Sequence, residues 1–278
     1  MANTTSINSE LFQNLLVQSQ YALYENSIAR AVTTVFDYPV GAGKVVSVPI
    51  WAGITSAKPG EGVAPAAADT NTNSKTINLA EHVVFAEVTD FLRDSAQESV
   101  IAGLANQSGL ALAEGLDKEL FGKFASGVTQ ELGAAGEELV VATLMKAAAT
   151  IRSNKYTGPL FAVLHPKQAY NMKQALTATN AYTANTNLGN TILGQYFVGQ
   201  VAGITILESA LIQADGNGDV TGCVFAPSAF GLAQRGGVTM EEQRNAAKRS
   251  TDVVLTAVAG VGVLRPELAV NIIGDATL

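Results

Sequence analysis

The side chains that could carry out acid–base or metal chemistry are few and widely separated in this chain. The only two histidines are His82 and His165, and neither belongs to a spacing that ligates metals. His82 falls in an expected strand, and His165 directly precedes a proline, where it shapes the start of a helix. We therefore expect neither histidine to be catalytic or to bind a metal.

Motifs for nucleophilic and phosphate chemistry are missing from the sequence. It contains no G-x-S-x-G elbow and no G-x-x-x-x-G-K-[ST] phosphate loop. Glu81 and Glu87 are candidates for paired carboxylates, but charges on a hairpin edge also serve to block aggregation. Cys223 is the only cysteine, and we expect it to be a small buried hydrophobe. These features favour a protein that is not an enzyme and has no cofactor, with a soluble enzyme carrying an acidic site as the distant alternative.

The composition indicates a folded chain with much of its surface covered by neighbouring subunits. Hydrophobic residues make up 47% of the 278 residues and charged residues only 15%, against roughly 25% charged in soluble globular proteins. The net charge is −7 and no run is rich in lysine or arginine, which argues against tight nucleic-acid binding. This balance of charges would suit a container that must not adhere to polyanionic contents.

The N-terminal residues have neither the basic nor the apolar region of a signal peptide. The longest apolar stretch, residues 253–264, is too short to span a bilayer. We expect a protein that folds in a cytoplasm and does not enter a membrane.

Residues 8–30 have leucines and alanines at mostly helical spacing and predict an amphipathic N-terminal arm. Two β-rich runs follow, residues 44–51 and 74–91, and the segment 52–73 between them is rich in glycine, alanine, proline and threonine. We expect the two runs to form a long hairpin that projects from the body. Because an isolated hairpin is only marginally stable in water, another chain must order it.

A capping box, Ser95 to Glu98, predicts the start of one long helix that reaches about Phe124. Gly103, Gly109 and Gly115 weaken this helix. They either permit close approach of another backbone or simply reflect a glycine-rich composition. The later elements that we expect are a helix over 137–152, a strand over 160–164, a helix over 166–176, a loop over 177–190, strands over 204–207 and 222–225, a short helix from 227, and strands over 253–264 and 267–273.

This order of elements resembles that of the major capsid proteins of tailed bacteriophages, the Hong Kong 97 fold. Three stretches look like that family: Gly158 to Tyr170, Gly199 to Ser209, and the region from Cys223 through Val238–Arg244 to Gly260–Glu267. The resemblance covers nearly the whole chain as a pattern of elements and loose motifs.

The resemblance implies an α+β fold with defined parts. These are an N-terminal arm (residues 1–42), an extended β-hairpin loop (43–92), a peripheral domain with a spine helix (93–153), an axial domain (154–235), and C-terminal strands of the peripheral domain (236–278). It also implies self-assembly into hexamers and pentamers of an icosahedral shell that encloses packaged double-stranded DNA, contacted without sequence specificity. A separate scaffolding protein and a portal protein are the expected partners, together with a decoration protein in some shells. The virion capsid, assembled in the host bacterial cytoplasm, is the expected location. An encapsulin-like bacterial nanocompartment, with the same fold around cargo protein, is the alternative.

We expect intersubunit contacts at two places in the chain. The hairpin contributes Trp51, Lys58 and Glu61. The mixed-charge segment 241–252 contributes Arg244, Lys248 and Arg249, because charges at the rim of an interface fix its register. A solvated face is the simpler interpretation of that segment. Lys44, Lys58 and Lys75 lie in or beside the loop, but no matching asparagine and acid for a cross-link can be assigned.

Overall fold

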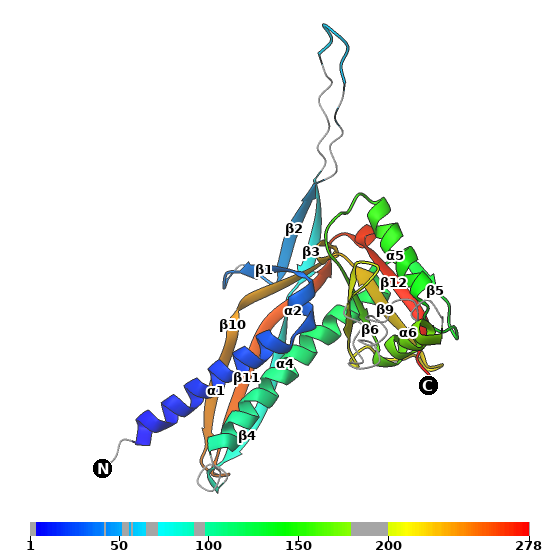
Figure 1. Cartoon of the computed structure of the whole chain (residues 1–278). Coiled ribbons are helices and arrows are strands. Elements are labelled where there is room, and N and C mark those ends of the chain that lie inside the picture. The colour runs from blue at the N-terminus through cyan, green and yellow to red at the C-terminus, as the bar shows by residue number, and fades with distance from the viewer. Residues whose placement is uncertain are drawn as a thin grey trace.

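The computed structural model describes residues 4–41, 43–51, 56, 58–64, 72–91, 98–178 and 200–277. Two sheets with their helices form the body, and a two-stranded hairpin projects from it (Figure 1). The expected capping residue Ser95 and most of the expected loop 177–190 lie outside the described residues.

The first sheet is long and has four strands in the order β1-β10-β11-β4. They are β1 (Thr34–Tyr38), β10 (Phe230–Asn245), β11 (Ser250–Val263) and β4 (Ala80–Thr89). β1 runs parallel to β10, whereas the other two pairs are antiparallel. Along β11, the side chains of Val253, Leu255, Ala257 and Ala259 are all buried, so every second residue faces the core.

Three helices accompany this sheet: α1 (Thr4–Asn26), α2 (Ile28–Val32) and the long α4 (Glu98–Gly127). α1 lies along α4 in Figure 1, and the two are in contact. A Cβ atom at Gly109 would collide with the carbonyl oxygen of Ser19 and lie 2.7 Å from the Cβ of Ala22. The Ser19 hydroxyl donates across the same contact to the carbonyl of Ala105, at 2.9 Å. Of the two explanations for the helix glycines, close backbone approach therefore holds at Gly109.

A buried carboxylate on α4 holds the junction between α1 and α2. Asp117 accepts hydrogen bonds from the Ser27 hydroxyl at 3.0 Å and from the backbone N–H groups of Ile28 and Ala29 at 3.1 and 2.8 Å. Burial raises the pKa of Asp117, although these hydrogen bonds act in the opposite direction. The expected N-terminal arm is thus helical, and its part from Leu15 to Ala29 packs against the body.

The second sheet has six strands in the order β5-β12-β9-β6-β8-β7. They are β5 (Glu131–Gly133), β12 (Ala269–Asp275), β9 (Asp219–Phe225), β6 (Leu160–Leu164), β8 (Ile204–Glu208) and β7 (Gln200–Val201). The helices α5 (Val141–Ser153) and α6 (Pro166–Ala178) pack with this sheet, and short 3-10 turns occupy Pro227–Ala229 and Pro266–Leu268.

An aromatic cluster joins the two sheets to the long helix. Phe124 of α4 lies 5.8 Å from Phe225 of β9 and 5.7 Å from Phe230 of β10, measured between ring centroids. Phe225 and Phe230 meet edge to face at 5.0 Å, a geometry that aromatic pairs favour. All three rings are essentially inaccessible to solvent. The core is therefore continuous from one sheet to the other.

The hairpin consists of β2 (Val45–Trp51) and β3 (Thr72–Asn78), which pair antiparallel. Its base is anchored by a small cluster of its own, in which Val46 and Ile77 pack with Ala233 and Leu264 of the body. A Cβ at Gly260 would collide with the carbonyl oxygen of Asn78. Glycine therefore lets β3 cross directly over β11.

The expected second run of the hairpin, residues 74–91, divides into two strands with different partners. β3 completes the hairpin, whereas β4 leaves it and pairs with β11 from Ala80↔Ala259 to Thr89↔Ser250. The last hairpin contact is the hydrogen bond from the Leu79 N–H to the Lys44 carbonyl, at 2.8 Å. The hairpin is therefore shorter than the loop 43–92 expected from the sequence.

The two sheets also combine strands from different expected domains. β5 and β12, expected in the peripheral domain, both pair into the six-stranded sheet with β9. The helix expected from residue 137 begins at Val141 instead. The backbone carbonyl of Glu137 accepts a hydrogen bond from the Asp275 N–H, at 2.8 Å. Glu137 therefore contacts the end of β12 and does not form a first helical turn.

Candidate assembly surfaces

The outward face of strand β2 is exposed from Val45 to Trp51. Trp51 is 63% exposed, and Val45 on the same face and Val63 near the tip are 53% and 63% exposed. At the tip, Lys58 and Glu61 are exposed, and the Val63 N–H closes a turn on the Gly60 carbonyl at 3.1 Å. These tip residues lie far from both sheets (Figure 1). The structure thus places Trp51, Lys58 and Glu61 on one projecting element without a covering surface in the described chain.

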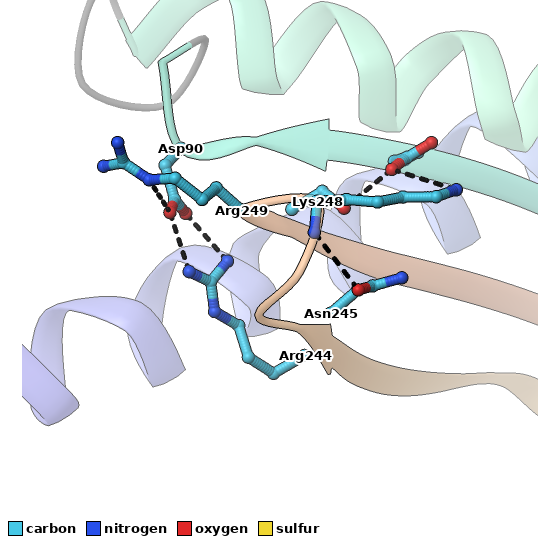
Figure 2. A network of polar contacts seen from close by, with 7 residues as sticks. Asp90, Arg244, Asn245, Lys248 and Arg249 are labelled. Carbon is cyan, nitrogen blue, oxygen red and sulfur yellow. Dashed lines mark hydrogen bonds and ion pairs between the residues drawn. The ribbon is translucent and has the colours of Figure 1, made fainter.

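A network of charges closes the opposite end of the four-stranded sheet, at the turn between β10 and β11 (Figure 2). Arg244 binds Asp90 in a bidentate manner, with its two terminal nitrogens 2.8 and 2.7 Å from the two carboxylate oxygens. The Nε atom of Arg249 lies 3.7 Å from the same carboxylate. Asp90 is only 8% exposed, and its hydrogen bonds raise the pKa of Arg244. Arg244 and Arg249 are thus brought together by one buried acid at the end of β4.

Lys248 belongs to a second pair in the same network. Its Nζ atom lies 3.6 Å from Glu87, which also accepts a hydrogen bond from the Ser250 hydroxyl at 2.6 Å. The hydrogen bond from Ser250, and then the charge of Lys248, lower the pKa of Glu87. The side chains of Lys248 and Arg249 are 63% and 80% exposed. The network therefore fixes the turn within the chain while it presents cations at the tip, and an intersubunit role for these residues stays a prediction.

The two histidines and the cysteine contact other residues within the fold. The Nδ1 atom of His165 accepts a hydrogen bond from the Lys167 N–H at 3.2 Å, at the start of α6, as expected for a residue that shapes this turn. Burial and the charge of Lys167 lower the pKa of His165. His82 lies 3.3 Å from Glu119 between β4 and α4. Cys223 is fully buried, as predicted, and burial raises the pKa of its thiol.

Two negative findings concern the described residues alone. Within the ranges given above, no group of histidine, cysteine and acidic side chains is placed to hold a metal ion. None of the helices in that part of the chain has the length and apolar character needed to cross a membrane.

One exposed surface, on β4, was not predicted from the sequence. On β4 the side chains of Val83 and Phe85 are 54% and 62% exposed, on the face of the sheet that points away from α4. The sequence offers only a weak signal for this surface, since the acids Glu81 and Glu87 share the odd positions with the apolar Val83 and Phe85. It was obscured because residues 74–91 were taken as one strand of the hairpin.

Comparison with known proteins gives a consistent picture of the fold. The model of a family described as phage capsid protein matches residues 72–272. No curated protein matches the chain. A capsid structure of the cyanophage P-SCSP1u is 19% identical with a TM-score of 0.67, and covers 88% of this chain and 87% of its own. A structure from Mycobacterium phage Che8 is 18% identical with a TM-score of 0.61, over 83% and 84% of the two chains. The capsid of a native GTA particle is 14% identical with a TM-score of 0.65, over 91% and 90%. These similarities confirm the α+β, Hong Kong 97-like fold class.

Proposed function

This chain belongs to the phage capsid protein family, and from that premise we propose that it forms the hexamers and pentamers of an icosahedral shell around packaged double-stranded DNA. Family membership makes it a capsid shell protein of a bacteriophage. The observation that carries the finer proposal is the hairpin, because it projects from the body with Trp51 and Val45 exposed.

A projecting hairpin of this kind needs a second chain. Two-stranded hairpins are at best marginally stable alone in water, and among the described residues of β2 and β3 the buried ones, Val46 and Ile77, lie at the base. Overlap of many identical hairpins with neighbouring subunits sums weak contacts into a strong container. At the opposite end, the turn with Arg244, Lys248 and Arg249 supplies a rim of charge that fixes register between neighbours.

The charge balance supports a shell that encloses DNA without adhering to it. The chain carries a net charge of −7, so contacts with the packaged DNA are non-specific and weak. We propose a separate scaffolding protein and a portal protein as partners during assembly in the bacterial cytoplasm, with a decoration protein as an addition on the finished virion. The family match favours a phage shell over an encapsulin-like nanocompartment.

The test is electron microscopy of the expressed chain, alone and with the scaffolding protein encoded beside it. We expect closed particles with fivefold and sixfold capsomers. Removal of residues 52–71, with a short turn joining β2 to β3, should leave a folded protein that forms no closed shells. The buried base at Val46 and Ile77 is retained in that variant, and circular dichroism checks its fold. Normal particles from the shortened chain would refute the role of the hairpin, and a small discrete oligomer from the full chain would refute the shell.

A further inference from the structure

A cleft opens between the long helix α4 and the six-stranded sheet. Its volume is about 660 Å³. Its apolar lining includes Phe121 and Ala125 of α4, Ile273 of β12, and Leu211 and Ile212 from the segment before β9. We call the cleft defined by these five residues the α4 cleft. Concave sites with an apolar lining and a few polar groups are typical of binding sites.

Two acids without a cation partner give the α4 cleft its charge. Asp215 and Asp219 both line it, and no ion pair in the described part of the chain includes either of them. Lys118 lines the cleft as well, but its Nζ atom lies 3.4 Å from a carboxylate oxygen of Glu114, which offsets its charge. The α4 cleft therefore combines an apolar lining with a net negative charge.

The exposed face of α5 has the opposite character. Ala142, Met145 and Ala149 follow one another at spacings of three and four residues and form an exposed apolar stripe, in which Met145 is 54% exposed. Lys146 and Arg152 are exposed on the two sides of this stripe, and no ion pair between described residues includes them. Anchors at this spacing are those with which an amphipathic helix enters a groove.

The chain cannot place its own α5 in its own α4 cleft. Ile273 of β12 lines the cleft, whereas a Cβ at the next residue, Gly274, would lie 3.8 Å from the Cβ of Leu139, just before α5, and 3.5 Å from the Nε2 atom of Gln168 on α6. Successive residues of a strand point to opposite faces of a sheet. α5 and the α4 cleft therefore lie on opposite faces of the six-stranded sheet, and another chain must fill the cleft.

We propose that the exposed face of α5 docks in the α4 cleft of a second copy of this chain, with Met145 entering between α4 and the sheet. This inference rests on the proposed shell function. Charge complementarity selects the occupant, because Lys146 and Arg152 bring two cations to a cleft that holds two acids without cation partners. Opposite charges across an interface also fix the orientation of the two partners.

The geometry of this contact suits a ring. The docking helix and the receiving cleft are different surfaces of the same chain, so the contact is heterologous. Heterologous contacts generate rings when the rotation between copies closes. Each copy then offers α5 to one neighbour and the α4 cleft to the other, as hexamers and pentamers require.

The experiment assembles particles from two kinds of copy, each with one added cysteine. One copy carries Met145→Cys. The other carries Gln213→Cys, since Gln213 is exposed and lines the α4 cleft. Cys223 is fully buried and does not react in the folded protein. Purified particles are treated with a short bis-maleimide, and cross-linked dimers are quantified after denaturation.

In the control mixture Val17→Cys replaces Gln213→Cys. Val17 is 63% exposed on α1, and α1 meets α4 at Gly109, on the N-terminal side of the cleft. We expect several-fold more dimers from the Met145→Cys and Gln213→Cys mixture than from the control mixture, and few from Met145→Cys alone. Equal dimer yields from the two mixtures in intact particles, or dimers chiefly from Met145→Cys alone, would overturn the docking and leave the shell function standing. Absence of particles from the wild-type chain with its scaffolding protein would contradict the proposed function, and the docking with it.

A charge exchange tests the same contact by particle yield. Lys146→Glu brings a further acid to the negative cleft and should reduce the yield several-fold. Gln213→Lys in the same chain adds a cation to the cleft and should restore much of that yield. An undiminished yield from Lys146→Glu, or no recovery in the double variant while circular dichroism shows both variants folded, would count against the docking of α5 in the α4 cleft.

Discussion

The attachment of the hairpin to the body depends on a small cluster, and Ile77→Ala truncates the larger of the two buried hairpin side chains in it. Ile77 is 1% exposed and packs with Val46, Ala233 and Leu264. This cluster is separate from the main core. The substitution should therefore loosen the hairpin while the two sheets keep their packing.

The magnitude follows from the atoms removed. Isoleucine to alanine deletes the side chain beyond Cβ, and such truncations in buried sites cost about 2–5 kcal/mol. We expect the lower end, about 2 kcal/mol, because the partly exposed neighbours Val48 and Ile50 can relax into the space. A change of that size shifts the local opening equilibrium roughly 30-fold.

Hydrogen exchange followed by mass spectrometry measures this opening peptide by peptide. Residues 45–51 and 72–78 of the unassembled Ile77→Ala protein should exchange faster, while exchange in the six-stranded sheet stays at its wild-type rate. Val45→Ala is the matched control, since Val45 is 53% exposed on the other face of the hairpin. A fall in the stability of the whole body with unchanged hairpin exchange would show that the cluster does not hold the hairpin, and the reasoning would fail.

Three further outcomes can be measured on the unassembled protein. Gly109→Val should separate α1 from α4 and cost about 1–3 kcal/mol in urea unfolding, whereas Gly103→Val should not, because no atom lies within 4 Å of a Cβ there. Asp90→Asn should cost about 1 kcal/mol, since half-exposed Arg244 loses its charged partner, and the loss should shrink in high salt; an unchanged loss at high salt would point to packing instead. The folded-state pKa of His165 is lowered, so the unfolded chain takes up its proton first and stability should fall as the pH drops below about 6.5. His165→Gln should flatten that part of a stability-against-pH profile, and an unaltered profile would exclude His165 as its source.

Elements with strong local signals could be predicted from the sequence. The strand at Leu160–Leu164 and the helix that begins at Pro166 lie where the apolar run and the proline indicated. The long helix extends to Gly127, close to the predicted end at Phe124. Each of these signals spans only a few neighbouring residues, so the local sequence was sufficient.

Elements defined by distant partners could not be predicted. β10 was missed because Gly236, Gly237 and a run of charges interrupt its alternation, and its register itself shifts between Arg235 and Thr239. Its identity as a strand comes from pairing with β11. The hydrogen bonds between Arg244 and Asp90 join residues 154 positions apart, and no local pattern contains that distance. The exposed face of β4 was not predicted, because the local sequence does not show that β4 leaves the hairpin and pairs with β11.

The aromatic junction of Phe124, Phe225 and Phe230 has a mechanical consequence for the proposed shell. Because these rings lock the long helix to both sheets, and the Asn271 side chain also donates to the Phe124 carbonyl at 2.9 Å, the subunit body resists bending at this point. One sequence must nevertheless fit corners and flat facets of different curvature. In the proposed shell the accommodation then falls on the projecting hairpin, which lies outside the junction, while the body keeps one shape in every position.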